Sequence, residues 1–208
     1  METIRDFFGI QLRRSFTPLL SVLRWLRITP NQVTVSGTVL NMAAAGLVIA
    51  TPVAHHLIYA GVVFLIAGCF DMLDGALARL AQKTTPFGAF LDSTLDRVSE
   101  GVVFAGIAYL LATQGRSIDA ALVVLALLGS ILVSYTRARA EALGVECKVG
   151  LMSRPERIIL IALGLFFDVL PYVIYIMLAL TAFTVVQRVV HTYRQLGKQS
   201  KQGGFVER

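Results

Sequence analysis

The sequence has few charged residues, two cysteines and one tryptophan. Asp, Glu, Lys and Arg make up 15% of its 208 residues, whereas 56% are hydrophobic and the mean hydropathy is +0.71. Soluble domains average about 25% charged residues, and a soluble domain of this size still exposes much of its surface to water. The scarcity of charge therefore argues against a soluble globular protein, and the apolar content excludes a disordered chain. A polytopic membrane protein remains.

The two cysteines, Cys69 and Cys147, lie far apart and neither belongs to a CxxC pair. A structural zinc site is therefore not expected, and we interpret both as reduced thiols. The net charge of +6 is typical of basic loops on one side of a membrane and of contact with anionic headgroups. We expect a lipid bilayer as the partner and no nucleic acid.

The apolar segments predict an all-α protein with six transmembrane helices. No charged residue occurs between Arg27 and Asp71, a run too long for one span of about 20 residues. Thr29 and Pro30 suit an N-cap and a first helical turn. We place the spans at about 31–51, 55–80, 88–113, 118–142, 154–168 and 171–194.

The basic residues support this layout, because six spans put every Lys and Arg except Arg116 on one side. That bias predicts a multi-pass protein of the cell membrane with both termini in the cytoplasm. Residues 3–27 have apolar side chains at spacings of three and four, which predicts an amphipathic helix at the interface. We expect one domain over 1–208 and a flexible cytoplasmic tail over 195–208.

Four aspartates gather where two spans approach the cytoplasm. Asp71 and Asp74 share a face near the end of the second span, and Asp92 and Asp96 share a face near the start of the third. A short turn makes these spans antiparallel, so both faces meet at one depth. Ionisable residues inside spans indicate function.

Four carboxylates in a low-dielectric site repel one another unless cations neutralise them. Arg79 and Arg97 are too few for this role. Mg²⁺ and Mn²⁺ prefer oxygen ligands and often share them with substrate phosphates. The aspartates therefore predict two Mg²⁺ ions, with Mn²⁺ as a substitute, in a site for phosphoryl transfer.

The surrounding residues suit a phosphate-bearing ligand. Gly75 and Ala78 leave space on the face that carries Asp74, and Arg79 offers a guanidinium fork. Thr85 adds a hydroxyl in the turn. Taken singly, the glycines are also explained by close helix packing, which is common in membranes.

Together these residues form a pattern that closely resembles the signature of the CDP-alcohol phosphotransferase family. All eight fixed positions are present: Asp71-x2-Asp74-Gly75-x2-Ala78-Arg79-x8-Gly88-x3-Asp92-x3-Asp96. The resemblance implies six transmembrane helices, a homodimer, and transfer of a substituted phosphate from a CDP-linked donor, usually CDP-diacylglycerol, to an alcohol with release of CMP.

The resemblance also implies roles for individual residues. Asp71, Asp74, Asp92 and Asp96 would bind the two metals, and Asp96 would also be the general base on the acceptor hydroxyl. The donor would contact the following residues: Asn31, Gln32, Val33, Thr34, Gly75, Arg79 and Thr85.

Further stretches resemble one branch of the family, the phosphatidylinositol phosphate synthases of actinobacterial type. These stretches are 71–76, 87–92, 134–141, 154–157 and 186–188. The branch joins CDP-diacylglycerol to inositol 1-phosphate. The likeness implies an acceptor-phosphate site formed by Ser134, Arg137, Arg154, Arg157 and Arg188. Arg137 stands where that branch has Lys.

Other interpretations stay open. The arginines assigned to the acceptor-phosphate site are also explained by positive-inside bias alone. Phosphatidylglycerophosphate synthases share the mechanism, but Ser93 and Arg97 depart from their usual residues, and phosphatidylserine synthases need no phosphate pocket. A cation transporter with a midplane aspartate site accounts for the aspartates but not for Arg79, Thr85 and the glycines. An intramembrane prenyltransferase usually has more spans and another spacing.

Overall fold

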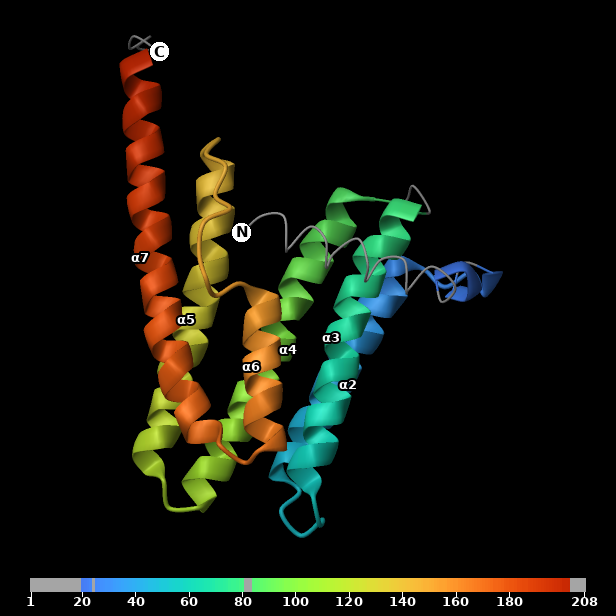
Figure 1. Ribbon diagram of the computed structural model, residues 1–208. Coiled ribbons are helices and arrows are strands. Elements are labelled where there is room, and N and C mark those ends of the chain that lie inside the picture. Colours follow the sequence, from blue (N-terminus) through green and yellow to red (C-terminus); the bar gives the residue numbers. More distant parts are fainter. Residues whose placement is uncertain (1–19, 24, 81–83, 203–208) are drawn as a thin grey trace.

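Six helices make up most of the described part of the chain. The computed structural model describes residues 20–23, 25–80 and 84–202, and these contain no strand. The helices alternate in direction along the chain (Figure 1), with the bounds α2 Pro30–Ile49, α3 His56–Leu80, α4 Pro86–Thr113, α5 Ser117–Ala142, α6 Arg154–Phe166 and α7 Leu170–Gln202. The all-α prediction is confirmed, and every predicted span coincides with one helix to within a few residues except at the end of α7.

Four of these helices, α2, α3, α5 and α7, are long and apolar enough to cross a membrane. Helix α4 carries four charged residues between Asp92 and Glu100, and α6 has 13 residues. Large apolar side chains such as Val124, Phe167 and Tyr172 are 60%, 70% and 65% exposed. Lipid, unlike water, is a favourable environment for such a surface. The chain is a multi-pass membrane protein, and its six helices are compatible with the predicted count.

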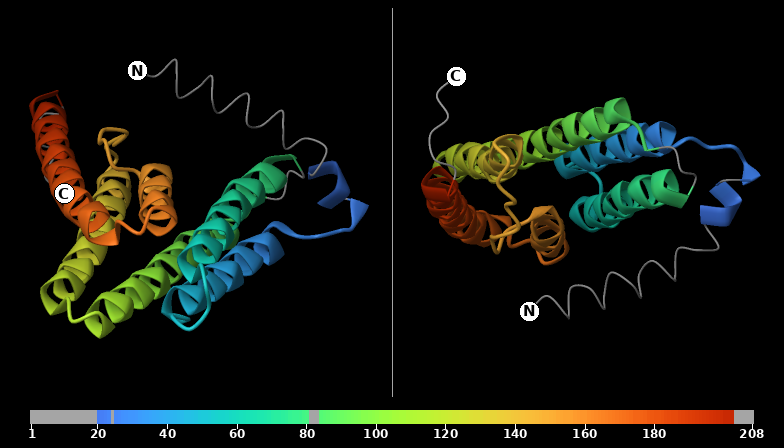
Figure 2. Two further views of the ribbon diagram at one scale, coloured as in Figure 1. Left: turned by 60° about the horizontal axis from the view of Figure 1, so that its bottom comes forward. Right: turned by 90° about the horizontal axis from the view of Figure 1, so that it is seen from above.

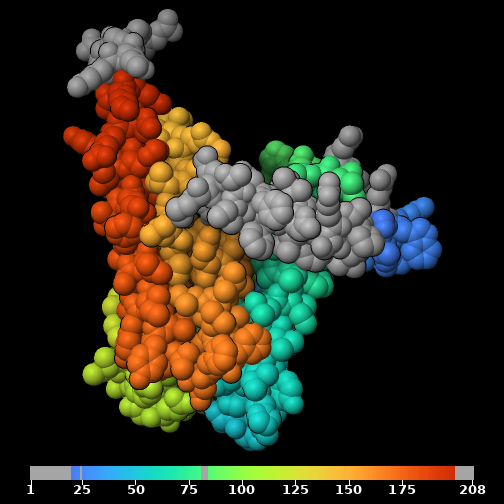
Figure 3. All heavy atoms as spheres, viewed as in Figure 1, coloured from blue at the N-terminus to red at the C-terminus, as the bar shows by residue number. Residues whose placement is uncertain are grey.

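The helices form two groups of three. Helix α2 packs against α3 and α4, while α7 packs against α5 and α6; contacts of α4 with α5 and of α3 with α6 join the groups (Figures 1 and 2). In Figure 3, α6 in orange lies against α3 in teal. One apolar cluster runs through all six helices, and its fully buried members include Val48, Ala60, Ile107, Ala126, Ile161 and Ile174.

Local signals set the starts of two helices that form the site. Thr29 caps α2 through a capping box, in which Gln32 N–H donates to Thr29 Oγ1 at 3.3 Å and Thr29 N–H donates to Gln32 Oε1 at 2.8 Å. Thr85 caps α4 by accepting from Gly88 N–H at 3.0 Å. A proline follows each threonine, and its fixed φ suits the first helical position. These caps place the polar residues of both helices at one end of the bundle.

One prediction about the ends of the chain needs correction, and another falls mostly on residues that the structure does not describe. Helix α7 continues to Gln202, so residues 195–202 are helical and not a flexible tail. His191 and Gln199 contact the carbonyls of Glu146 and Gly144, at 3.1 and 3.5 Å, which holds this extension against the preceding loop. The predicted interfacial helix lies mostly outside the described residues, as does 203–208; residues 20–23 and 25 are helical.

Candidate active site

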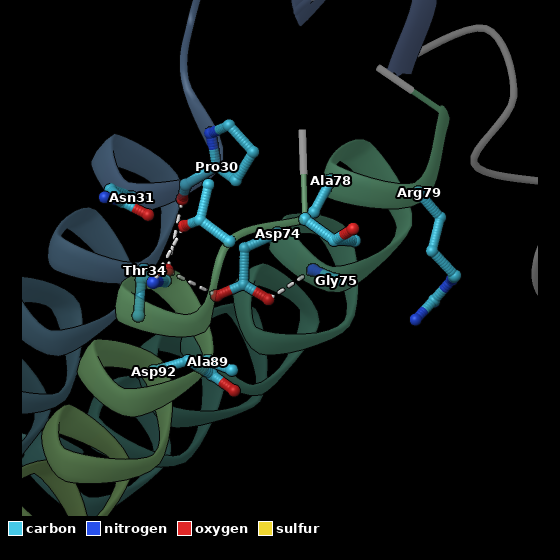
Figure 4. A pocket seen from close by; sticks show the side chains of 12 residues that line it. Pro30, Asn31, Thr34, Asp74, Gly75, Ala78, Arg79, Ala89 and Asp92 are labelled. Carbon is cyan, nitrogen blue, oxygen red and sulfur yellow. Dashed lines mark hydrogen bonds between the residues drawn. The ribbon is translucent and has the colours of Figure 1, made fainter. Parts of the chain in front are cut away.

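The first pocket lies where the start of α2, the end of α3 and the start of α4 meet. Its volume is about 180 Å³. Figure 4 shows its side chains arriving from all three helices. Five residues predicted to contact the donor line it: Asn31, Thr34, Gly75, Arg79 and Thr85. We call it the first pocket below.

Asp74 is held at the back of this pocket by two hydrogen bonds (Figure 4). Thr34 Oγ1 donates to Asp74 Oδ2 at 2.8 Å, and the Gly75 N–H donates to Asp74 Oδ1. Only 4% of Asp74 is exposed. Thr34 therefore orients a carboxylate on the neighbouring helix, a role that the sequence interpretation did not specify.

Gln32 and Val33 do not line this pocket, contrary to the interpretation of residues 31–34 as one donor-contacting segment. The side chain of Gln32 completes the cap of α2. Val33 is 3% exposed and packs with Leu20, Leu73 and Leu77. On a helix, four consecutive residues point in different directions, so only Asn31 and Thr34 reach the pocket.

Gly88 lies in close packing at the pocket wall. A Cβ at this position would lie 3.0 Å from Thr85 Oγ1 and 3.3 Å from Asn31 Oδ1. At Gly75 a Cβ would meet only the flexible Arg79 guanidinium, at 3.5 Å. Gly88 therefore serves the junction of α2 and α4, whereas Gly75 leaves space inside the pocket.

A second, larger pocket lies between α4, α5, α6 and α7. Its volume is about 590 Å³. All five residues predicted to bind an acceptor phosphate line it: Ser134, Arg137, Arg154, Arg157 and Arg188. Five further charged residues also line it: Asp92, Asp96, Arg97, Glu100 and Glu141. We call it the basic pocket.

Asp92 joins the two pockets, because it lines both of them. Asp74 faces the first pocket, and Asp96 faces the basic pocket. Asp71 lies close enough to Asp92 for their charges to repel. The structure thus places Asp74, Asp92 and Asp96 along the two pockets, with Asp71 near Asp92 but in the wall of neither pocket.

Arg154 neutralises part of this acidic cluster. Its Nη2 lies 2.8 Å from Asp71 Oδ2, and its Nη1 forms an ion pair with Asp96 Oδ1. Arg97 is near enough to attract Asp92 and Asp96. The sequence interpretation considered Arg79 and Arg97 as partners for the aspartates and assigned Arg154 only to the acceptor. It missed that Arg154 contacts two of the carboxylates, since the loop and helix that carry it are distant in sequence.

The four aspartates are suited as ligands of a hard divalent cation, because all four offer carboxylate oxygens. With Arg154 between Asp71 and Asp96, no three His, Cys, Asp or Glu side chains in the described ranges are placed to hold a metal ion together. A cation at these oxygens would replace the charge that Arg154 supplies here. The residues therefore fit a divalent metal, provided that the Arg154 side chain moves.

The other arginines of the basic pocket also have partners. Arg157 pairs with Glu100, with Nε and Oε1 at 2.8 Å, and is 1% exposed. Arg188 Nε donates to the Val149 carbonyl at 2.9 Å and is 4% exposed. Arg137 forms an exposed i,i+4 pair with Glu141 at 2.8 Å. Sequence reasoning missed Glu100, although it follows Asp92 and Asp96 at the same four-residue spacing.

Two pockets with charged side chains in their walls lie at one end of a bundle of apolar helices, which fits a membrane enzyme whose substrates carry charge. A family model of the CDP-alcohol phosphatidyltransferases matches residues 27–190. The chain belongs to this family and is a CDP-alcohol phosphotransferase.

The chain is similar to curated proteins from archaea and bacteria. It is 35% identical to an archaetidylinositol phosphate synthase of Methanothermobacter thermautotrophicus, over 94% of this chain and 97% of that protein. It is 40% identical to a phosphatidylinositol phosphate synthase of Corynebacterium glutamicum, over 83% of this chain and 81% of the relative.

Solved structures of the Mycobacterium tuberculosis phosphatidylinositol phosphate synthase PgsA1 share the fold. The structure with CDP-DAG bound matches with a TM-score of 0.76 and 32% identity, over 86% of this chain and 94% of that one. The complex with manganese and citrate matches with a TM-score of 0.75 and 32% identity, over 85% and 88%.

Proposed function

We propose that this enzyme transfers the phosphatidyl group from CDP-diacylglycerol to inositol 1-phosphate and releases CMP. The observation that carries the proposal is the junction at Asp92, where the first pocket and the basic pocket meet. A transferase needs two substrates to meet at one phosphorus, and the arrangement offers one pocket for each.

The first pocket is assigned to the CDP part of the donor. Arg79 offers a guanidinium to the pyrophosphate, and Gly75 lets the nucleotide approach the backbone. The relative that was solved with CDP-DAG supports a lipid-linked nucleotide as donor. A donor with diether chains has the same CDP part, and the archaeal relative is one reason to test it.

The basic pocket is assigned to the acceptor. Four arginines from α5, α6 and α7 line it, which suits an alcohol that carries its own phosphate. The names of the archaeal and corynebacterial relatives favour inositol phosphate over glycerol phosphate.

In the proposed reaction, the acceptor hydroxyl attacks the phosphorus that bears the lipid, and the bond from that phosphorus to the CMP oxygen breaks. Asp96 accepts the hydroxyl proton, because it is the aspartate that faces only the basic pocket. Divalent ions held by Asp71, Asp74, Asp92 and Asp96 would supply charge neutralisation of the pyrophosphate and of departing CMP. We propose two Mg²⁺ ions, with Mn²⁺ able to replace them; the manganese complex of the relative supports divalent-metal dependence.

The enzyme's surroundings follow from the same reasoning. We propose that the pockets open to the cytoplasm, because every Lys and Arg except Arg116 falls on their side of the predicted layout. We further propose a homodimer in the cell membrane, as the family resemblance implies.

The test is CMP release by the purified protein with CDP-diacylglycerol and Mg²⁺. Inositol 1-phosphate, glycerol 3-phosphate, free inositol and serine are supplied in separate reactions, each repeated with a diether donor. Release with inositol 1-phosphate alone is expected. Release with glycerol 3-phosphate alone would overturn the acceptor assignment and keep the mechanism. No release with any acceptor, from folded protein, would contradict both the proposed donor and the proposed acceptors.

A further inference from the structure

Glu100 is a partly buried carboxylate that the proposed reaction does not use. It lies one turn beyond Asp96 on α4, so three acidic side chains follow one stripe of this helix. Unlike Asp92 and Asp96, it is held by partners on two other helices. Its side chain is 12% exposed.

These partners fix the carboxylate from both sides. Arg157 Nε donates to Glu100 Oε1 at 2.8 Å, and Arg157 Nη2 donates to Glu100 Oε2 at 3.3 Å. Ser130 Oγ also donates to Glu100 Oε1. The contacts join α4, α5 and α6 beside the basic pocket, which both Glu100 and Arg157 line.

Glu100 and Met152 accept from three of the five N–H donors of the Arg157 guanidinium. Arginine has five N–H donors in a planar fork. Glu100 occupies the Nε and Nη2 side, and the Met152 carbonyl accepts from Nη1 at 3.4 Å. Among the described residues, one N–H on each of Nη1 and Nη2 has no partner, and the Nη1–Nη2 end of the fork matches two oxygens of a phosphate.

We propose that Glu100 is a positioning residue, which holds Arg157 so that its Nη1–Nη2 edge faces the acceptor phosphate. The inference rests on the proposed function, because it names what orients one arginine of the acceptor pocket. The proposal predicts the direction in which acceptor affinity changes when the Glu100 charge is removed. By charge alone, a carboxylate in an anion pocket weakens phosphate binding, so its removal would tighten binding. If Glu100 orients Arg157, its removal weakens binding.

The first experiment compares the wild type with Glu100→Gln. Glutamine keeps the shape, but its amide group donates and opposes the Nη2 donor of Arg157. The KM for the phosphorylated acceptor is expected to rise about tenfold, the equivalent of one charge-assisted hydrogen bond. The KM for CDP-diacylglycerol is expected to stay within about twofold of the wild-type value, since the first pocket is unchanged. An unchanged or lower acceptor KM would overturn the proposal.

Two further variants separate positioning from folding and from charge. Ser130→Ala keeps the Glu100 charge and removes one of its hydrogen bonds, so a smaller rise in acceptor KM is expected. It also serves if Glu100→Gln fails to fold, and an unchanged acceptor KM in Ser130→Ala would then count against the proposal. Glu146→Gln is the matched control, because Glu146 pairs with Lys148 in an exposed loop outside the basic pocket. A rise in acceptor KM for this control would show a general charge effect and contradict the inference.

A binding measurement separates this inference from the proposed function. Thermal stabilisation by inositol 1-phosphate and by inorganic phosphate is measured for the wild type, Glu100→Gln and Ser130→Ala. If the wild type uses another phosphorylated acceptor, the same comparison is made with that acceptor. If it turns over no acceptor but phosphate stabilises it, the proposed function fails while weaker stabilisation of Glu100→Gln supports the positioning role. Equal stabilisation of all three proteins, or none, overturns the role of Glu100.

Discussion

The two pockets differ in how they are built. The first pocket is formed by three helices that are consecutive in the chain, and most of its polar residues lie within 30–34 and 74–92. The basic pocket needs residues from 89 to 188, on four helices. The first pocket is therefore formed by a compact motif, whereas the basic pocket forms only when α6 and α7 pack against α3, α4 and α5.

The charges in the pockets also differ. Asp74 is held by a hydroxyl and a backbone N–H. In the basic pocket the arginines are paired with Asp71, Asp96, Glu100, Glu141 and backbone carbonyls. An acceptor phosphate must therefore compete with existing partners, and the cost differs from one arginine to the next.

Asp96→Asn is expected to lower kcat by at least about 10³-fold, because a general base contributes about 10²–10⁴-fold and this residue also serves as a metal ligand. The KM for the donor is expected to change little, since Asp96 does not line the first pocket. Steady-state kinetics and donor binding check both. Asp168→Asn, in the loop between α6 and α7, is the control. Turnover retained in Asp96→Asn would remove this residue from the base role.

Arg154→Ala is expected to raise the acceptor KM by about 10- to 100-fold and to leave the donor KM nearly unchanged, because one charged phosphate contact is lost. Initial rates with each substrate varied in turn measure the two values. Arg139→Gln removes an exposed charge outside both pockets and should leave both values unchanged. Equal effects of Arg154→Ala on both substrates would contradict the division between pockets.

The same variant tests whether Arg154 competes with the metal. Arg154 contacts Asp71 and Asp96 and neutralises part of their charge. Without the guanidinium only bound cations can neutralise these two carboxylates, so Mn²⁺ should bind more tightly. Electron paramagnetic resonance of free Mn²⁺ measures this without turnover. Weaker Mn²⁺ binding would show that Arg154 holds the carboxylates in a metal-binding arrangement.

Gly75→Ala is expected to raise the donor KM several-fold, up to about tenfold, without changing the acceptor KM. The added methyl group lies inside the first pocket, 3.5 Å from Arg79 Nη1, and takes space from the donor. Gly46→Ala is the control, because nothing lies within 4 Å of an added Cβ there. A larger effect on the acceptor than on the donor would break the assignment of the pockets.

Thr85→Ala is expected to give the smallest effect, a loss of about 1 kcal/mol from the missing cap of α4. Thermal unfolding in detergent should show a lower midpoint, whereas Thr85→Ser should keep it. A large rise in donor KM in Thr85→Ala, with no change in the midpoint, would instead assign Thr85 to donor contact.

Much of this molecule could be predicted because membrane helices and caps are local. Thr29 and Pro30 identify the start of α2, and the run without charge up to Asp71 shows two helices. The end of α7 could not be predicted, because the polar composition after Arg194 suits a helix as well as a tail, and contacts with the loop at 144–146 decide between them. Gln32 and Val33 show the same limit at residue scale, since a motif does not tell which side chains face a pocket.

The amino-acid sequence alone predicts the all-α membrane fold, the acidic motif of Asp71, Asp74, Asp92 and Asp96, and the set of arginines. These depend on hydropathy and helical spacing, which act over a few residues. The sequence alone does not predict that Arg154 lies between Asp71 and Asp96, or that Glu100 binds Arg157, 57 positions away. Such pairs depend on how helices far apart in the chain pack together, and the spacing of residues along one helix does not predict that packing.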